Sequence, residues 1–111
     1  MKIKISVEGV NSLENNPSIV EKSKIKVKKP KHYKVIMHND DYTTMEFVVY
    51  ILIEVFNKSL KDANRIMMEV HEKGRGIAGI YPYDIAVSKT AIAMDAAEKE
   101  GYPFKLTVEE E

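Results

Sequence analysis

The stretch that decides the fold runs from residue 33 to residue 56 and reads YKVIMHNDDYTTMEFVVYILIEVF. It opens on a short run rich in β-branched and apolar residues, residues 33–38, which predicts a strand. The turn formers Asn39, Asp40 and Asp41 stop that run. Thr43 and Glu46 have the spacing of a capping box, so we expect Thr43 to cap a helix. The helix body, residues 47–56, is apolar almost all round, which is typical of a helix buried on several sides.

A second helix follows directly. Ser59 repeats the N-cap pattern, and the apolar residues after it recur at helical spacing. Gly74 suits a left-handed C-cap because glycine adopts positive φ without a steric penalty. We therefore expect a helix between these two residues.

The C-terminal part of the chain predicts a strand, a helix and a strand. Residues 77–81 form a short β-rich run beside glycines, and Pro82 suits the first turn of a helix that reaches about residue 100. Residues 104–108 alternate apolar and polar, so this last strand should bury one face. The predicted fold class is α+β: a β-α-α-β-α-β sandwich with the helices packed on one face of a three-stranded sheet.

Charge divides the chain of 111 residues in two. Residues 1–32 carry eight lysines and three glutamates, a net charge of +5, and have no aromatic residue. Residues 33–111 carry nine basic and fourteen acidic residues, a net charge of −5. We expect a flexible basic N-terminal extension over 1–32 and a core domain over 33–111.

Composition excludes several classes of protein. The chain has no cysteine, which excludes a disulfide scaffold, cysteine-ligated zinc and thiol catalysis. No apolar run approaches the roughly 18 residues of a membrane span, and the first residues lack the apolar segment of a signal peptide. These observations predict a soluble protein of the cytoplasm with no membrane partner.

The acidic turn, Asn39 to Asp41, is the first candidate site. In the simplest interpretation its side chains only cap the backbone of the turn. Two adjacent carboxylates and an amide also form an acceptor cluster that could hold a cation, either a hard metal ion or an ammonium group. Met45 stands close enough in sequence to line such a site, although methionines usually fill cores.

His71 is the second candidate. Near a helix C-terminus, a histidine usually interacts with the helix dipole or stays exposed. A weak metal site with Asp40 and Asp41 is the alternative, but the chain has no HExxH motif. No nucleophile stands out with a matching base, and Gly74 and Gly76 follow a helix, whereas phosphate loops follow a strand. We therefore expect a binding module, not an enzyme, without a bound metal or cofactor.

The residues that carry these features resemble the ClpS adaptor family. The resemblance rests on YKVI at 33–36, NDDYTTMEFV at 39–48, VHEKG at 70–74 and Gly79. It implies a β-α-α-β-α-β domain without enzymatic activity that delivers proteins with destabilising N-terminal residues to a Clp AAA+ unfoldase and its peptidase. One residue departs from the pattern: the family usually has proline where Thr44 stands, which we expect to loosen the turn slightly.

The resemblance also implies a site for each part of the substrate. The acceptors for the substrate's α-ammonium group would be Asn39, Asp40 and His71. The pocket for a bulky first side chain (Leu, Phe, Tyr or Trp) would be lined by Met45, Val48, Met67, Val70 and Phe104, with Asp41 and Thr43 at its rim. The implied partner is the N-terminal domain of an unfoldase of the ClpA or ClpC type, contacted near Asp84 and Lys89 by a monomeric adaptor.

Two other functions remain open at this point. A nucleic-acid or ribosome-associated module would use the lysines of residues 22–31 as phosphate contacts, although that run lacks aromatic residues and the core domain is acidic. A metal-dependent hydrolase is the third possibility.

Overall fold

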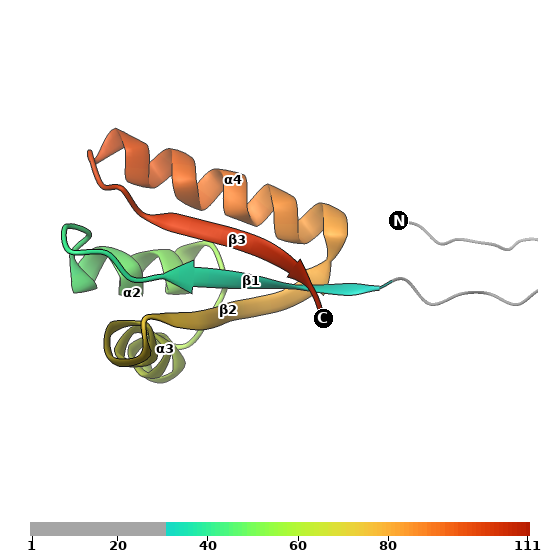
Figure 1. Cartoon of the computed structure of the whole chain (residues 1–111), viewed down its shortest axis with the longest axis horizontal. Helices are drawn as coiled ribbons and strands as arrows, with labels where there is room; N and C mark the ends of the chain where they lie inside the picture. Colours follow the sequence, from blue (N-terminus) through green and yellow to red (C-terminus); the bar gives the residue numbers. More distant parts are fainter. Residues whose placement is uncertain (1–30) are drawn as a thin grey trace, which may run out of the picture. The chain divides into compact units, whose positions relative to one another are not determined.

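The computed structural model describes residues 31–111, and six elements follow one another in it (Figure 1). They are β1 (His32–His38), α2 (Met45–Glu54), α3 (Leu60–Lys73), β2 (Arg75–Pro82), α4 (Tyr83–Lys99) and β3 (Lys105–Glu110). This order confirms the predicted β-α-α-β-α-β arrangement. The extension predicted over 1–32 lies, up to residue 30, outside the described residues.

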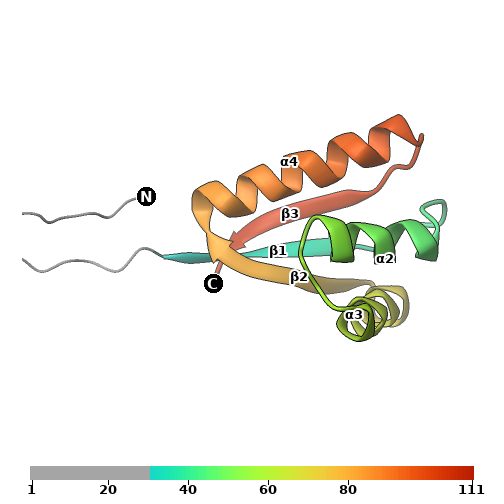
Figure 2. The same cartoon turned by 180° about the vertical axis from the view of Figure 1, so that it is seen from behind.

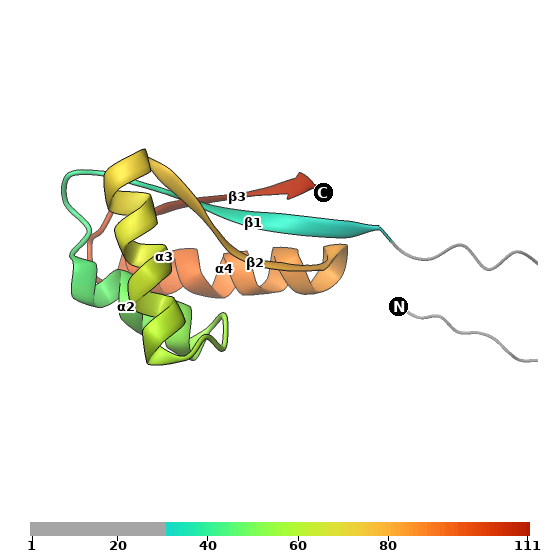
Figure 3. The same cartoon turned by 90° about the horizontal axis from the view of Figure 1, so that it is seen from below.

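The three strands form one antiparallel sheet in the order β2-β1-β3. β1 is therefore central, and its last residue, His38, stands opposite Arg75 of β2 and Lys105 of β3. All three helices lie on one face of the sheet, as Figure 3 shows from below and Figure 2 from behind. The predicted α+β sandwich is confirmed.

The core lies between the sheet and the helices. Alternate residues of β1, Val35 and Met37, are fully buried and face the helices. β3 contributes Leu106 by the same alternation, and Phe104 is buried just before that strand begins. Burying a side chain of this size contributes roughly 1.5–3 kcal/mol, so each of these residues stabilises the fold.

The caps and helix bounds differ in detail from the prediction. The N-cap of α2 is Thr44, not Thr43: the Thr44 side chain accepts a hydrogen bond of 3.1 Å from the Phe47 amide. α2 ends at Glu54, earlier than expected, and buries chiefly one side, since Tyr50 is 56% exposed. Pro82 is the N-cap of α4 and does not lie in its first turn. α3 has the expected caps, Ser59 and Gly74.

Candidate functional site

The turn after β1 is built around the carboxylate of Asp40. Its Oδ1 accepts hydrogen bonds from the backbone amides of Tyr42 (2.8 Å) and Thr43 (2.7 Å). Its Oδ2 accepts one from the Thr43 hydroxyl at 2.8 Å. The interpretation that side chains of the acidic turn cap its backbone is thus correct for Asp40. A carboxylate has about four acceptor positions, so one position on Oδ2 is still available to a ligand.

Thr43 does not cap α2 because the helix begins at Met45, one residue too late for Thr43 to be its N-cap. The Thr43 hydroxyl donates to Asp40 and so belongs to the turn. Thr44 is then the residue at the N-cap, where its hydroxyl supplies a cap that proline could not. The expected loosening of the turn by Thr44 stays a prediction.

Asp40 is ionised in this environment. Partial burial of the Asp40 carboxyl raises its pKa, but the two backbone hydrogen bonds from Thr43 and Tyr42 and the bond from the Thr43 hydroxyl lower it by more, so the pKa lies below the ordinary value of 3.8. A fixed negative charge therefore stands at the end of β1 at all pH values near neutrality.

The turn opens onto a pocket of about 250 Å³ between β1, α2 and α3. One part of its wall is polar, made by the turn and by His71; the other part is apolar, made by α2 and α3. Val48 and Val70 form its buried floor, and Met45, at the first position of α2, is 41% exposed at the mouth. The pocket brings together nine of the ten residues that the family resemblance implied for substrate binding: Asn39, Asp40, Asp41, Thr43, Met45, Val48, Met67, Val70 and His71.

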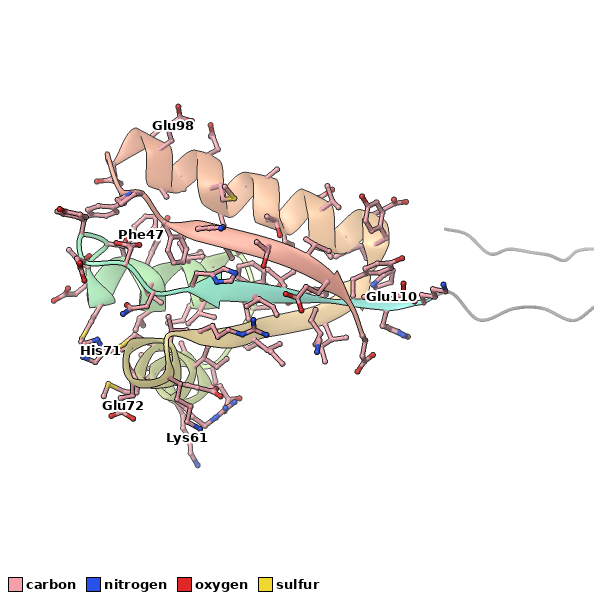
Figure 4. All side chains as sticks on the ribbon, viewed as in Figure 1. Phe47, Lys61, His71, Glu72, Glu98 and Glu110 are labelled. Atoms are coloured by element: carbon pink, nitrogen blue, oxygen red, sulfur yellow. The ribbon has the colours of Figure 1, made fainter. Side chains whose placement is uncertain are left out.

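A backbone link holds the polar wall together. The Asn39 amide donates to the Gly74 carbonyl at 3.0 Å, which joins the end of β1 to the end of α3. Gly74 has φ of 91°, the left-handed conformation that lets α3 stop there and β2 begin. His71 lies in the last turn of α3, at the same end of the molecule as the acidic turn (Figure 4). Its side chain therefore reaches the pocket that Asn39 and Asp40 also line.

Phe104 does not line this pocket. It is only 4% exposed and lies in the core, where its ring meets the ring of Phe47 edge to face at a centroid distance of 5.9 Å. Phe47 also meets Tyr102 at 5.1 Å. These contacts pack Phe104 against Phe47 of α2, the helix that carries Met45 and Val48. A role of Phe104 in substrate binding stays a prediction.

Asp84 and Lys89, the residues expected at the unfoldase contact, lie on α4 and not at the pocket. Asp84 is exposed in the first turn of the helix. Lys89 donates to the Val55 carbonyl at 2.6 Å and to the Asn57 side chain at 3.0 Å. This ammonium group caps the C-terminal end of α2, where a positive charge is favoured by the helix dipole. The sequence alone gave no signal for this capping role.

Two further properties bear on a metal site and on a membrane-spanning helix. Among residues 31–111 there is no group of three or more histidine, aspartate or glutamate side chains that could hold a metal ion. Within the same range, no helix is both long and apolar enough to cross a membrane.

His38, the last residue of β1, gives the site a neighbour that responds to pH. Its Nε2 lies 2.8 Å from the Thr107 hydroxyl. Partial burial lowers the pKa of His38 below 6.5, and the cations Lys105 and Arg75 lower it further, against a smaller opposite effect of Glu109. The neutral form of His38 is thus favoured in the folded protein.

This shift predicts a pH dependence of folding. Because the folded pKa is lower than the unfolded one, His38 adds stability that is present above about pH 6.5 and is lost as the pH falls toward the folded pKa. We expect the free energy of unfolding of His38→Gln to fall less between pH 7.5 and pH 5.5 than that of wild type, measured by urea unfolding. Parallel curves for the two proteins would contradict this account.

Comparison with known proteins identifies the family. The family model for "ATP-dependent Clp protease adaptor protein ClpS" matches residues 28–107. The chain belongs to the ClpS family. This confirms the resemblance found in the sequence, and with it a role as a Clp protease adaptor, a class of protein that is not catalytic.

Individual ClpS relatives cover most of the chain. An "ATP-dependent Clp protease adapter protein ClpS" from Clostridium acetobutylicum is 60% identical over 89 residues, which are 80% of this chain and 88% of the relative. One from Acetivibrio thermocellus is 53% identical over 95 residues, 85% of this chain and 96% of the relative. The chain thus spans nearly the whole length of these adaptors.

A solved ClpS structure has the same fold. It is described as "The structure of Agrobacterium tumefaciens ClpS2 bound to L-phenylalaninamide", with a TM-score of 0.72 and 40% sequence identity, over 75% of this chain and 100% of that one. The ligand of that protein has an α-amino group and a benzyl side chain, but no free carboxylate.

Proposed function

We propose that this adaptor binds the first residue of a polypeptide through its free α-ammonium group and its bulky apolar side chain, and delivers the polypeptide to a Clp AAA+ unfoldase for degradation. The observation that carries the proposal is the divided lining of the pocket, with ionised Asp40 beside Asn39 and His71 on one wall and an apolar floor on the other. The ligand of the solved relative, an amino acid amide, has both matching groups.

The chemistry of the two walls accounts for the specificity. An ammonium group has three donors, and the acceptor positions of Asn39, Asp40 and His71 match that number. Oδ2 of Asp40 keeps one acceptor position because its other contact is the Thr43 hydroxyl. The turn is already ordered by its internal hydrogen bonds, so little conformational entropy is lost when a substrate binds.

The size of the pocket agrees with a single large side chain. Burying a Leu or Phe side chain contributes roughly 1.5–3 kcal/mol, and each hydrogen bond to a charged group contributes a similar amount. After the loss of translational and rotational freedom, micromolar affinity is the expected result.

The direct test compares two peptides that differ only at the amino group. A peptide with a free N-terminal Phe should bind with micromolar affinity in a fluorescence anisotropy titration, and its N-acetylated form should bind at least about tenfold more weakly, because it lacks the charge that Asp40 attracts. Equal affinities for the two peptides would show that the ammonium group is not recognised.

Met45 should decide which first residues enter. It stands 41% exposed at the mouth of the pocket, where its thioether would meet a branch at Cβ of the incoming residue. We expect Met45→Ala to improve the affinity of peptides beginning with Ile or Val by about tenfold, while affinity for N-terminal Phe changes little. The same selectivity in wild type and variant, in competition assays, would remove Met45 from this role.

The proposed partner surface lies on α4. Asp84 offers an exposed charge to the N-terminal domain of an unfoldase of the ClpA or ClpC type. Lys89 is held on Val55 and Asn57 and lies over the Tyr81 ring, with its Nζ 5.4 Å from the ring centroid. Substitution of Lys89 would therefore act partly through the end of α2. A monomeric adaptor that meets this partner would work in the cytoplasm.

A further inference from the structure

Among residues 31–111, β2 (Arg75–Pro82) pairs with β1 alone, so it forms one margin of the sheet (Figure 1). An edge strand exposes backbone donors and acceptors that can pair with another chain, and proteins usually shorten or cover such edges. With eight residues, β2 is longer than an average strand. Its only irregularity is a shift of register opposite Val35 and Ile36.

A groove of about 430 Å³ follows this edge. Two isoleucines of β2, Ile77 and Ile80, line it and are 41% and 43% exposed. Ile66 of α3 lies beneath them and is buried. The groove shares no residue with the pocket of the acidic turn. It is therefore a separate surface that offers apolar contacts next to unpaired backbone.

The charges around the groove are mainly positive. Lys58 and Arg65 line it together with a single acid, Glu69, and Arg75 begins the strand. The ion pair that Arg65 makes, with Asp62 at 3.7 Å, joins two side chains that are more than half exposed, so it is weak and easily exchanged. We call the following residues the β2 edge surface: Lys58, Arg65, Glu69, Arg75, Ile77 and Ile80.

We propose that the β2 edge surface docks an extended, acidic segment of a protein partner, which adds to β2 as a fourth strand. Backbone hydrogen bonds to the edge would supply affinity, and alternate side chains would supply specificity. Apolar side chains of the segment would cover Ile77 and Ile80, and its carboxylates would meet Lys58, Arg65 and Arg75.

Charge and composition favour this occupant over two others. No aromatic side chain lines the groove, so a nucleic-acid base would have no ring there on which to stack. In a two-fold dimer through β2, each basic surface would face its own copy, and like charges would repel. An acidic polypeptide meets neither difficulty.

The experiment uses the full chain and an N-acetylated ten-residue peptide of alternating Glu and Val. Acetylation removes the ammonium group, so the result is independent of the function proposed for the acidic turn. We expect binding with a Kd below about 1 mM, with amide shifts in NMR spectra centred on Gly76, Gly79 and their neighbours in β2. A peptide of alternating Lys and Val serves as the control and should not bind.

Matched variants test the charges. Lys58→Glu combined with Arg65→Glu should weaken binding of the Glu-Val peptide about tenfold, and Glu69→Lys in the same groove should strengthen it. The proposal is overturned if the Glu-Val peptide does not bind or shifts residues away from β2, or if the Lys-Val peptide binds equally. Preferential binding of an RNA oligonucleotide to the same residues, or a dimer that buries β2 at rising protein concentration, would overturn it as well.

Discussion

Asp40→Asn should weaken the binding of a peptide with a free N-terminal Phe at least about tenfold, because the NH2 group that replaces Oδ2 has no charge and cannot accept a hydrogen bond from the ammonium group. The asparagine oxygen can still accept hydrogen bonds from the amides of Tyr42 and Thr43, which hold the turn. The substitution therefore removes the charge and leaves most of the turn in place. Isothermal titration of the two proteins with the same peptide measures the difference.

Because of the geometry of the turn, Asp40→Ala tests the role of the charge less cleanly than Asp40→Asn. Alanine removes three hydrogen bonds at once, including the one from the Thr43 hydroxyl, and would disorder the turn as well as remove the charge. We expect it to lose more affinity than Asp40→Asn and to lower the free energy of unfolding. If Asp40→Asn binds as tightly as wild type while Asp40→Ala does not, Asp40 only shapes the turn and the ammonium group is held elsewhere.

The acidity of Asp40 gives an independent check. Its pKa lies below 3.8 because the hydrogen bonds outweigh the effect of burial, so the carboxylate stays charged in mild acid. Protonation of Asp40 therefore cannot weaken binding between pH 5 and pH 8. A loss of affinity in that range that persists in Asp40→Asn must come from another group of the pocket.

The order of the elements could be predicted because each has a clear period. The alternation around Val35 and Met37 and the helical spacing after Ser59 each depend on one buried face, and the structure buries those faces. The N-cap could not be predicted with the same certainty. The spacing to Glu46 pointed to Thr43, whereas the structure shows Thr43 bonded to Asp40 and Thr44 bonded to the Phe47 amide, contacts visible only in three dimensions.

The pocket, too, could be predicted from the sequence only in part. The sequence places its polar residues at two helix or strand ends, and the fold brings those ends together through the link between Asn39 and Gly74. Their role in binding stays a prediction. Lys89 could not be assigned from sequence, because an exposed lysine and one that caps the end of α2 look alike until the partner carbonyl of Val55 is seen.

Phe104 shows why a buried position does not reveal its function. The alternation of residues 104–108 correctly indicated that its side chain faces the helices, but it could not show whether the ring reaches the pocket or stops behind α2. The contact with Phe47 shows that the ring packs in the core. Phe104→Ala should consequently lower the free energy of unfolding by about 3–5 kcal/mol, a large part of the stability of a small domain.

Phe104→Leu separates a role in core packing from a role in the pocket wall. Leucine keeps most of the buried volume, so we expect a smaller loss of stability, about 1 kcal/mol, and a folded protein whose affinity for free N-terminal Phe peptides is within about twofold of wild type. Urea unfolding and peptide titration of the same samples give both quantities. If Phe104 instead formed the pocket wall, Phe104→Leu would lose affinity in proportion to the contact it removes while its stability changed little. The edge-to-face packing of Phe104 on Phe47 argues for the first outcome, because the ring is already enclosed by α2 and the core.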